Sequence, residues 1–253
     1  MSAVRRIAAF TVLMLTGWPV VSGLLAANDP PAGDLLAQYI AKFQTRYQSS
    51  RTSSATFLEL YSENGRLVRS EAGTAYFRRP SRMRWEYDAP EKNLFLVDGR
   101  NAWFYVPADH TVTKVPAKHS ADWRTPLALL AGDVKVSKVC SRVALASLQK
   151  PLDSGDVMLA CQLRGEARAN SAEDAPQKDP TRAGEASVFL ELVPANGELV
   201  RVLVNDQGGI GIEFRFKNWN FDAPTAAGQF EFHPPAGVVI LNGELPAQKE
   251  IVK

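Results

Sequence analysis

A strict alternation of apolar and charged residues between Arg82 and Tyr87 limits the folds open to this chain. Met83, Trp85 and Tyr87 share one face of an extended segment, and the residues between them are charged. A period of two is typical of a β-strand with one buried and one solvated face. The segment therefore predicts a one-sided sheet with an aromatic inner face, which something else in the protein must cover.

Similar strand patterns recur along the chain after Ser54, and turn signals such as Asn64-Gly65 separate them at short intervals. Strands joined locally in this way favour an antiparallel meander. We expect no regular structure after the run Pro234-Pro235-Ala236-Gly237. The expected strands cover residues 55–61, 68–79, 82–87, 93–97, 102–106, 111–115, 138–146, 157–163, 187–192, 199–205, 209–216, 219–221 and 230–232.

Two helices are expected beside these strands. Asp29-Pro30-Pro31 offers a cap and a first turn for a helix that ends near Ser49-Ser50. Its apolar face is formed by Leu35, Leu36, Tyr39, Ile40, Phe43 and Tyr47. A second helix, with Leu127 and Leu130 on one face, interrupts the strands and is either a plug at one end of the sheet or a lid.

The N-terminus has the pattern of a secretory signal peptide. Arg5 and Arg6 precede an apolar run, and small residues follow at Gly23, Ala26 and Ala27. The run is short for a membrane anchor, the alternative interpretation. We expect residues 1–27 to be removed and residues 28–253 to form a single soluble domain outside the cytoplasm. Residues 165–186 lack an apolar period and predict a mobile surface insertion.

Charge and cysteine content narrow the possible functions. The chain has 29 Lys and Arg against 27 Asp and Glu, and two of the basic residues lie in the predicted signal peptide. The neutral balance that remains argues against nucleic-acid binding. Cys140 and Cys161 flank a predicted hairpin, so both a disulfide and two buried free thiols are open to them. No histidine has metal-ligand spacing, and no metal site is expected.

No constellation typical of an enzyme stands out. His110, His119 and His233 are scattered, and neither a nucleophile elbow nor a phosphate-binding glycine loop is present. We therefore expect no catalytic residues and no cofactor. The apolar inner face has two interpretations, a filled core and a ligand cavity, and periodicity leaves both open.

Several motifs, taken together and in order, resemble the periplasmic outer-membrane lipoprotein carrier family, LolA. They are Arg79-Pro80 followed by Met83-Arg84-Trp85-Glu86-Tyr87, Leu96-Val97-Asp98-Gly99, Trp103-Phe104-Tyr105-Val106-Pro107, Thr125-Pro126-Leu127-Ala128-Leu129-Leu130 and Phe230-Glu231-Phe232-His233-Pro234-Pro235-Ala236-Gly237-Val238. The resemblance extends from about Asp34 to Val239. Met83 departs from the phenylalanine common in the family, and the two cysteines are not general in it.

The resemblance implies a mainly β fold, a single antiparallel and strongly curved sheet of about eleven strands that forms an incomplete barrel covered by short helices. It implies a monomeric periplasmic carrier for triacylated lipoproteins. An inner-membrane ABC transporter would supply the cargo, and an outer-membrane receptor would accept it. The same half-barrel also serves lipid-binding and envelope-stress sensor modules, which is the alternative function; a secreted hydrolase is a third.

Two sets of site residues follow from the pattern and the resemblance. The first set should line the acyl-chain cavity: Ile40, Phe43, Phe57, Met83, Trp85, Phe95, Trp103, Leu130, Phe214 and Phe216. The second is Arg79 alone, which the resemblance makes a latch that bonds carbonyls of the lid helix and holds the empty cavity closed.

Overall fold

The computed structural model describes residues 32–117, 125–131, 135–146, 149–164, 187–205 and 209–243. The predicted signal peptide and the predicted insertion at residues 165–186 lie outside these ranges. Within them, none of the helices has the length and apolar character that a membrane span requires.

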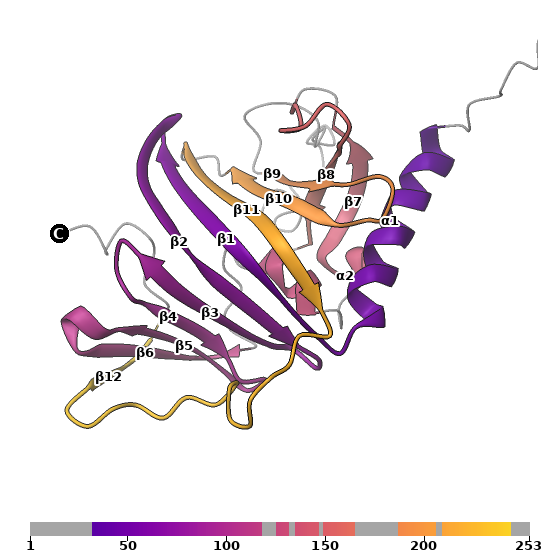
Figure 1. The fold of residues 1–253 in the computed structure, drawn as a ribbon. Coiled ribbons are helices and arrows are strands. Elements are labelled where there is room, and N and C mark those ends of the chain that lie inside the picture. Colours follow the sequence, from indigo (N-terminus) through magenta and orange to yellow (C-terminus); the bar gives the residue numbers. More distant parts are fainter. Residues whose placement is uncertain are drawn as a thin grey trace, which may run out of the picture. The chain divides into compact units, whose positions relative to one another are not determined.

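The described residues form one large open sheet with few helices (Figure 1). The sheet order is β12-β6-β5-β4-β3-β2-β1-β11-β10-β9-β8-β7, so β12 and β7 are the two edges and the sheet does not close. The strands are β1 (Thr52–Glu63), β2 (Arg66–Arg78), β3 (Arg82–Ala89), β4 (Leu94–Val97), β5 (Asn101–Val106), β6 (Thr111–Pro116), β7 (Cys140–Leu145), β8 (Val157–Leu163), β9 (Ser187–Leu192), β10 (Leu199–Asn205), β11 (Ile210–Phe221) and β12 (Val239–Asn242).

The prediction of about eleven strands in an antiparallel-only sheet is wrong at the C-terminal end. The short apolar run of β12 forms a strand after the prolines that seemed to end regular structure, and it pairs in parallel with β6. The expected strand at residues 230–232 is absent, because Gly228, with φ of 77°, and its neighbours form turns there. Residues 219–221 belong to β11 and are not a separate strand.

The helical segments of the described residues are few, and α1, η3 and α2 pack against one face of the sheet. Helix α1 (Ala32–Ser49) agrees with the predicted amphipathic helix, and Phe43 and Tyr47 are buried. The second predicted helix is a 3₁₀ helix, η3 (Thr125–Ala131). It is followed by α2 (Val136–Val139), a single turn of helix in a place where a strand was expected to begin. A 3₁₀ helix also follows β5, η1 (Pro107–Asp109).

Two local features fix the geometry of β1, β2 and β3. Asn64 and Gly65 have φ of 50° and 77°, the left-handed values that a two-residue hairpin turn needs. A Cβ on Gly73 would lie 1.9 Å from the carbonyl oxygen of Glu86, so only glycine allows β2 to approach β3 this closely. In the strand order, the two strands of the long β1–β2 hairpin are the central pair of the sheet.

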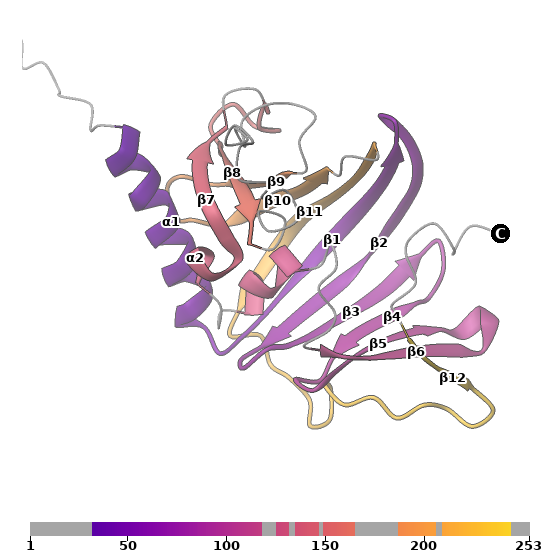
Figure 2. The ribbon, with the colours of Figure 1, turned by 180° about the vertical axis from the view of Figure 1, so that it is seen from behind.

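The hydrophobic residues separate onto the two faces of the sheet. The inner face, which the helical segments cover (Figure 2), carries one large cluster of aromatic and aliphatic side chains. The outer face carries a small cluster of Leu96, Trp103 and Val112, against which Phe232 and Val238 of the C-terminal segment pack. The C-terminal segment thus covers part of the outer face before β12 joins the sheet edge.

Candidate functional site

The aromatic inner face has Trp85 at its centre. The Trp85 ring centroid lies 4.8 Å from that of Phe57, 5.4 Å from that of Phe214 and 5.9 Å from that of Phe216. Trp85 is only 1% exposed. Its indole nitrogen is buried and has no hydrogen-bond partner among the described residues. This ring set comes from β1, β3 and β11, strands that are distant in sequence and adjacent or nearly adjacent in the sheet.

All but one of the residues predicted to line a cavity belong to this inner cluster. Ile40 is partly buried against the cluster, and the others are buried in it. These others are Phe43, Phe57, Met83, Trp85, Phe95, Leu130, Phe214 and Phe216. Their common location is a finding, whereas their role in holding acyl chains stays a prediction.

Trp103 is the exception, and its assignment to the inner face is wrong. Strand β5 is apolar on both faces, and Ala102, Phe104 and Val106 are the residues that point inward. Trp103 lies on the outer face, where its indole nitrogen donates to Asp98 over 2.8 Å and its ring centroid lies 5.5 Å from that of Phe232. A strand covered on both faces gives no alternation from which to choose an inner residue.

The sequence analysis also missed inner-face residues that the period of two predicts. Phe77 is buried in the inner cluster, and its ring centroid lies 5.7 Å from that of Trp85. It stands two residues from Ala75 on β2, so the period of two used for β3 places it on the same face. Phe104 follows from the same argument only once the side of its strand is known.

The cover of the inner face comes from α1, η3 and α2. η3 contributes Leu127, Leu129 and Leu130, and α2 contributes Val136 and Val139, all buried in the inner cluster. These contacts are apolar on both sides. The cover therefore shields the aromatic face through apolar side chains.

Polar contacts and a disulfide hold α2 in place. The Val136 amide donates to Gln44 Oε1 of α1 over 2.9 Å. Arg164 Nε donates to the Ser137 carbonyl over 2.8 Å. Cys140, which directly follows α2, forms a disulfide with Cys161 of β8. The end of the cover that leads into β7 is thus tied covalently to the next strand.

Arg79 lies where β2 ends, close to the end of α1. Its Nε donates to the Ser50 carbonyl over 2.9 Å, and its backbone amide donates to the Arg51 carbonyl over 3.1 Å. Ser50 is itself bonded through Oγ to Asp222 Oδ1 over 2.8 Å. Residues 118–124, before η3, lie outside the described part of the chain, so the predicted bonds to the lid helix stay a prediction.

Arg78, the neighbour of Arg79, has a different environment. Its guanidinium carbon lies 4.7 Å from the centroid of the Phe230 ring, a cation–π contact with the C-terminal segment. Burial lowers the pKa of Arg78, and the nearby positive charges of Arg82 and Arg51 lower it further. Arg78 therefore belongs to the outer face, where it packs on the C-terminal segment.

Toward the β1–β2 turn, the inner face becomes polar. The Tyr87 hydroxyl donates to Glu59 Oε2 over 2.9 Å. Arg69 Nε lies 3.1 Å from Glu71 Oε2, and the Arg69 guanidinium carbon lies 5.8 Å from the centroid of the Tyr61 ring. We call these five residues the polar cluster. The sequence analysis did not predict this cluster, because nothing in the sequence distinguishes Glu59 and Glu71 from carboxylates on the outer face.

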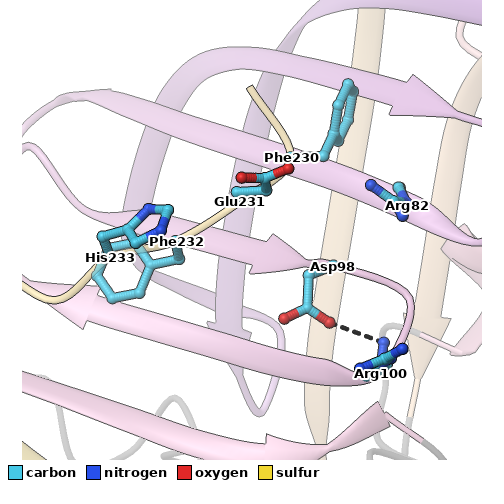
Figure 3. Close-up of a pocket in the computed structure, with 7 residues that line it drawn as sticks. All are labelled: Arg82, Asp98, Arg100, Phe230, Glu231, Phe232 and His233. Carbon is cyan, nitrogen blue, oxygen red and sulfur yellow. Dashed lines mark hydrogen bonds between the residues drawn. The ribbon is translucent and has the colours of Figure 1, made fainter. Parts of the chain in front are cut away.

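An open pocket of about 280 Å³ lies on the outer face (Figure 3). It is lined by Arg82, Asp98, Arg100, Phe230, Glu231, Phe232 and His233. Burial raises the pKa of Asp98, but hydrogen bonds from the Asn101 backbone and the Trp103 indole outweigh it, so the net pKa is lowered. The carboxylate thus stabilises the β4–β5 turn.

Among the described residues, no group of three or more His, Cys, Asp or Glu is arranged to hold a metal ion.

Together, the fold and its inner face define a class of protein: a single open sheet whose aromatic face is covered by short helices in place of a second sheet. The family model described as outer membrane lipoprotein carrier protein LolA matches residues 48–153. The resemblance seen in the sequence motifs is therefore confirmed.

Individual proteins extend the similarity beyond that region. The chain is 27% identical to the outer-membrane lipoprotein carrier protein of Chromobacterium violaceum, over 91% of this chain and 97% of the relative. It is 28% identical to the protein of the same description from Methylibium petroleiphilum, over 86% of this chain and 96% of the relative. The solved Pseudomonas aeruginosa MucA/MucB complex is a weaker match, with a TM-score of 0.43 and 17% identity over 82% of this chain and 64% of that chain. A likeness of that degree carries no argument about function.

Proposed function

We propose that this protein is a periplasmic carrier that shelters the acyl chains of lipoproteins against its inner face and moves them from the inner to the outer membrane. The observation that carries the proposal is the aromatic inner face, which in the described part of the chain is covered by α1, η3 and α2. The similarity to lipoprotein carriers over most of the chain supports it.

The physical task matches such a surface. Each methylene removed from water contributes ~0.8 kcal/mol, so a long acyl chain left in water costs on the order of 10 kcal/mol. A chain that enters between the cover and the sheet exchanges the contacts of Leu127, Leu129 and Leu130 for its own. Because apolar contacts replace apolar contacts, binding and release need no nucleotide on the carrier itself.

The proposal includes the cellular context. An inner-membrane lipoprotein-releasing ABC transporter would load the carrier, and an outer-membrane lipoprotein receptor would unload it. The carrier would act as a monomer, without catalysis and without a cofactor. The predicted signal peptide and the similarity to outer-membrane lipoprotein carrier proteins support a periplasmic location.

A loading experiment tests the proposal. The mature protein is incubated with membranes that contain a labelled triacylated lipoprotein, the ABC transporter and ATP. We expect a soluble one-to-one complex, detected by native mass spectrometry. If lipid binds but no lipoprotein is carried, a sensor module on the same fold explains the protein better, and turnover of an ester substrate would identify a hydrolase.

A further inference from the structure

We propose that the polar cluster binds the neutral ester or amide carbonyl groups of an acylated ligand, with Arg69 as the hydrogen-bond donor. The ligand would then lie in one direction on the inner face, its polar end toward the β1–β2 turn and its acyl chains toward Trp85. This inference rests on the proposed function and adds to it an orientation and a preference for one class of lipid.

The strand register places the polar cluster beyond the aromatic part of the inner face. Trp85 is opposite Ala75, and Tyr87 is opposite Gly73. Farther along β2, Glu71 is opposite Glu59 and Arg69 is opposite Tyr61. Directly opposed residues share a face, and each step of two residues advances ~7 Å. The inner face thus changes from aromatic to polar along β2, over a length suited to an amphipathic ligand.

Gly73 allows the aromatic part of the inner face to adjoin the polar cluster. It has no side chain in the row between Trp85 and Glu71, so the Tyr87 ring can reach across β2 to Glu59. Gly73 is required here, because a Cβ would collide with the β3 backbone. The aromatic part and the polar cluster are therefore continuous, without a side chain of β2 between them.

Two buried donor atoms of Arg69 lack a well-aligned acceptor in the described part of the chain. Its Nε and Nη1 atoms are buried and lack a hydrogen-bond partner within the described residues, although Nε faces the Glu71 carboxylate at ion-pair distance. Buried N–H groups are nearly always paired, so unpaired ones call for an acceptor. Trp85 Nε1 is a further donor on the same face without a partner among the described residues. The remaining buried atoms without a partner there are Arg46 Nε, a donor, and Asn93 Oδ1, an acceptor.

The charge around Arg69 selects the kind of acceptor. Glu59 and Glu71 lie in the cluster, and Glu63 accepts from the Tyr61 hydroxyl over 3.1 Å. Glu63 is opposite Arg66 on β2. Glu59 and Glu71, in contrast, are two carboxylates beside the single guanidinium of the cluster, so a free fatty acid or a phosphate would add negative charge next to them. An uncharged carbonyl oxygen accepts from Arg69 without adding negative charge. Ester and amide carbonyls next to acyl chains have this chemistry.

The position of the helical cover agrees with this direction. In both ribbon views, the turn that joins β1 and β2 projects away from α1 and α2 (Figures 1 and 2). The acyl chains would therefore lie beneath the helices, while the polar end lies toward the part of the hairpin that those helices do not reach.

Ligand competition tests the inference. A hydrophobic fluorescent dye bound to the protein is displaced by one of three ligands with a single palmitoyl chain: monopalmitoylglycerol, a neutral ester, palmitate, a carboxylate, or monopalmitoyl lysophosphatidylglycerol, which joins an ester carbonyl to an anionic phosphate. We expect the neutral ester to bind about 10-fold more tightly than either anion, the range of one charge-assisted hydrogen bond. Equal or tighter binding of the anions would overturn the inference.

Variants locate the effect. Arg69→Met keeps the aliphatic stem and removes the donors, and it should weaken binding of monopalmitoylglycerol about 10-fold. Because it leaves the Glu71 carboxylate without this cation, the double variant Arg69→Met/Glu71→Gln, which removes both charges of the ion pair, is measured beside it. Arg66→Met, an exposed residue of the same strand, is the matched control and should leave binding unchanged.

The outcomes separate the two proposals. If wild type and both Arg69 variants bind the ester equally, the orientation is wrong and the carrier function stands. If no acyl ligand displaces the dye from the wild-type protein, the carrier function itself fails, and this inference fails with it.

Discussion

The Arg79 guanidinium donates a hydrogen bond to the backbone carbonyl of Ser50 over 2.9 Å and so ties the end of β2 to the point where α1 ends. Ser50 Oγ is in turn bonded to Asp222, just after β11. Ser50, just after α1, is thus the residue to which both Arg79, after β2, and Asp222, after β11, are bonded. This geometry gives the proposed latch a definite partner.

Replacing Arg79 should slow cargo release. Arg79→Leu removes a charge-assisted bond of ~1.5–3 kcal/mol that favours the covered, empty state. The loaded state becomes relatively more stable, so we expect normal loading and at least about 10-fold slower transfer to the receptor. The measurement is transfer of labelled lipoprotein over time. Arg51→Leu, an exposed control, should transfer at the wild-type rate, and an equally fast Arg79→Leu would refute the latch.

A buried ion pair on the outer face should dominate the stability of the β9–β10 region. Arg201 Nε lies 2.7 Å from Glu191 Oε2, and Glu191 Oε1 accepts from the Leu152 amide over 2.6 Å. Glu191→Gln removes the nearer of the two carboxylates beside Arg201 and leaves Glu213 Oε1 at 3.7 Å, which should cost about 3 kcal/mol in urea unfolding. Glu86→Gln breaks a pair whose carboxylate side chain is 41% exposed and should cost under about 1 kcal/mol. Similar losses in both variants would contradict the expectation.

Reduction of the disulfide should loosen the cover as well as destabilise the fold. The Cys140–Cys161 bond spans 21 residues and directly follows α2. Its loss should cost ~3 kcal/mol and increase binding of a hydrophobic dye to the inner face. Thermal unfolding and dye fluorescence are measured with and without dithiothreitol. The Cys140→Ala/Cys161→Ala variant is the control, since it should match the reduced protein and not respond to the reductant.

Acid should weaken the contribution of Asp98. Because the folded pKa of Asp98 is lowered, its stabilising effect is present above its ordinary pKa of ~3.9 and is lost as the pH falls through the folded value. Asp98→Asn should therefore be less stable than wild type at neutral pH, with a difference that shrinks below about pH 4. Urea unfolding of both proteins, at neutral pH and below about pH 4, measures this difference in the free energy of unfolding. A difference that does not change with pH would show that Asp98 has no such role; Asp88→Asn, at an exposed position, is the control.

Much of the inner face could be predicted because a period of two assigns every second residue to one side. Met83 and Trp85 on β3 and Phe214 and Phe216 on β11 were placed correctly in this way. The argument fails for β5, where both faces are buried and Trp103 points outward. It also fails for β12, because the prolines before Val239 conceal a short strand whose pairing partner lies far away in sequence.

Contacts between residues that are far apart in the sequence could not be predicted from the sequence. The backbone carbonyl of Ser50 carries no signature in the sequence, so neither this partner of Arg79 nor the packing of Arg78 on Phe230 could be foreseen. The polar cluster was equally hidden, because a glutamate at an inner position looks the same as one at an outer position until the register of β1 and β2 is known. Tertiary contacts decided these cases.

Site-specific photocrosslinking tests the central claim most directly. Benzoylphenylalanine is placed at Phe214 on the inner face or at Phe232 on the outer face, and the protein is loaded with a lipoprotein that has radiolabelled acyl chains. We predict acyl-chain crosslinks from position 214 and none from position 232. Crosslinks from position 232 alone would contradict the proposed function, because the acyl chains would then lie on the face opposite the aromatic cluster.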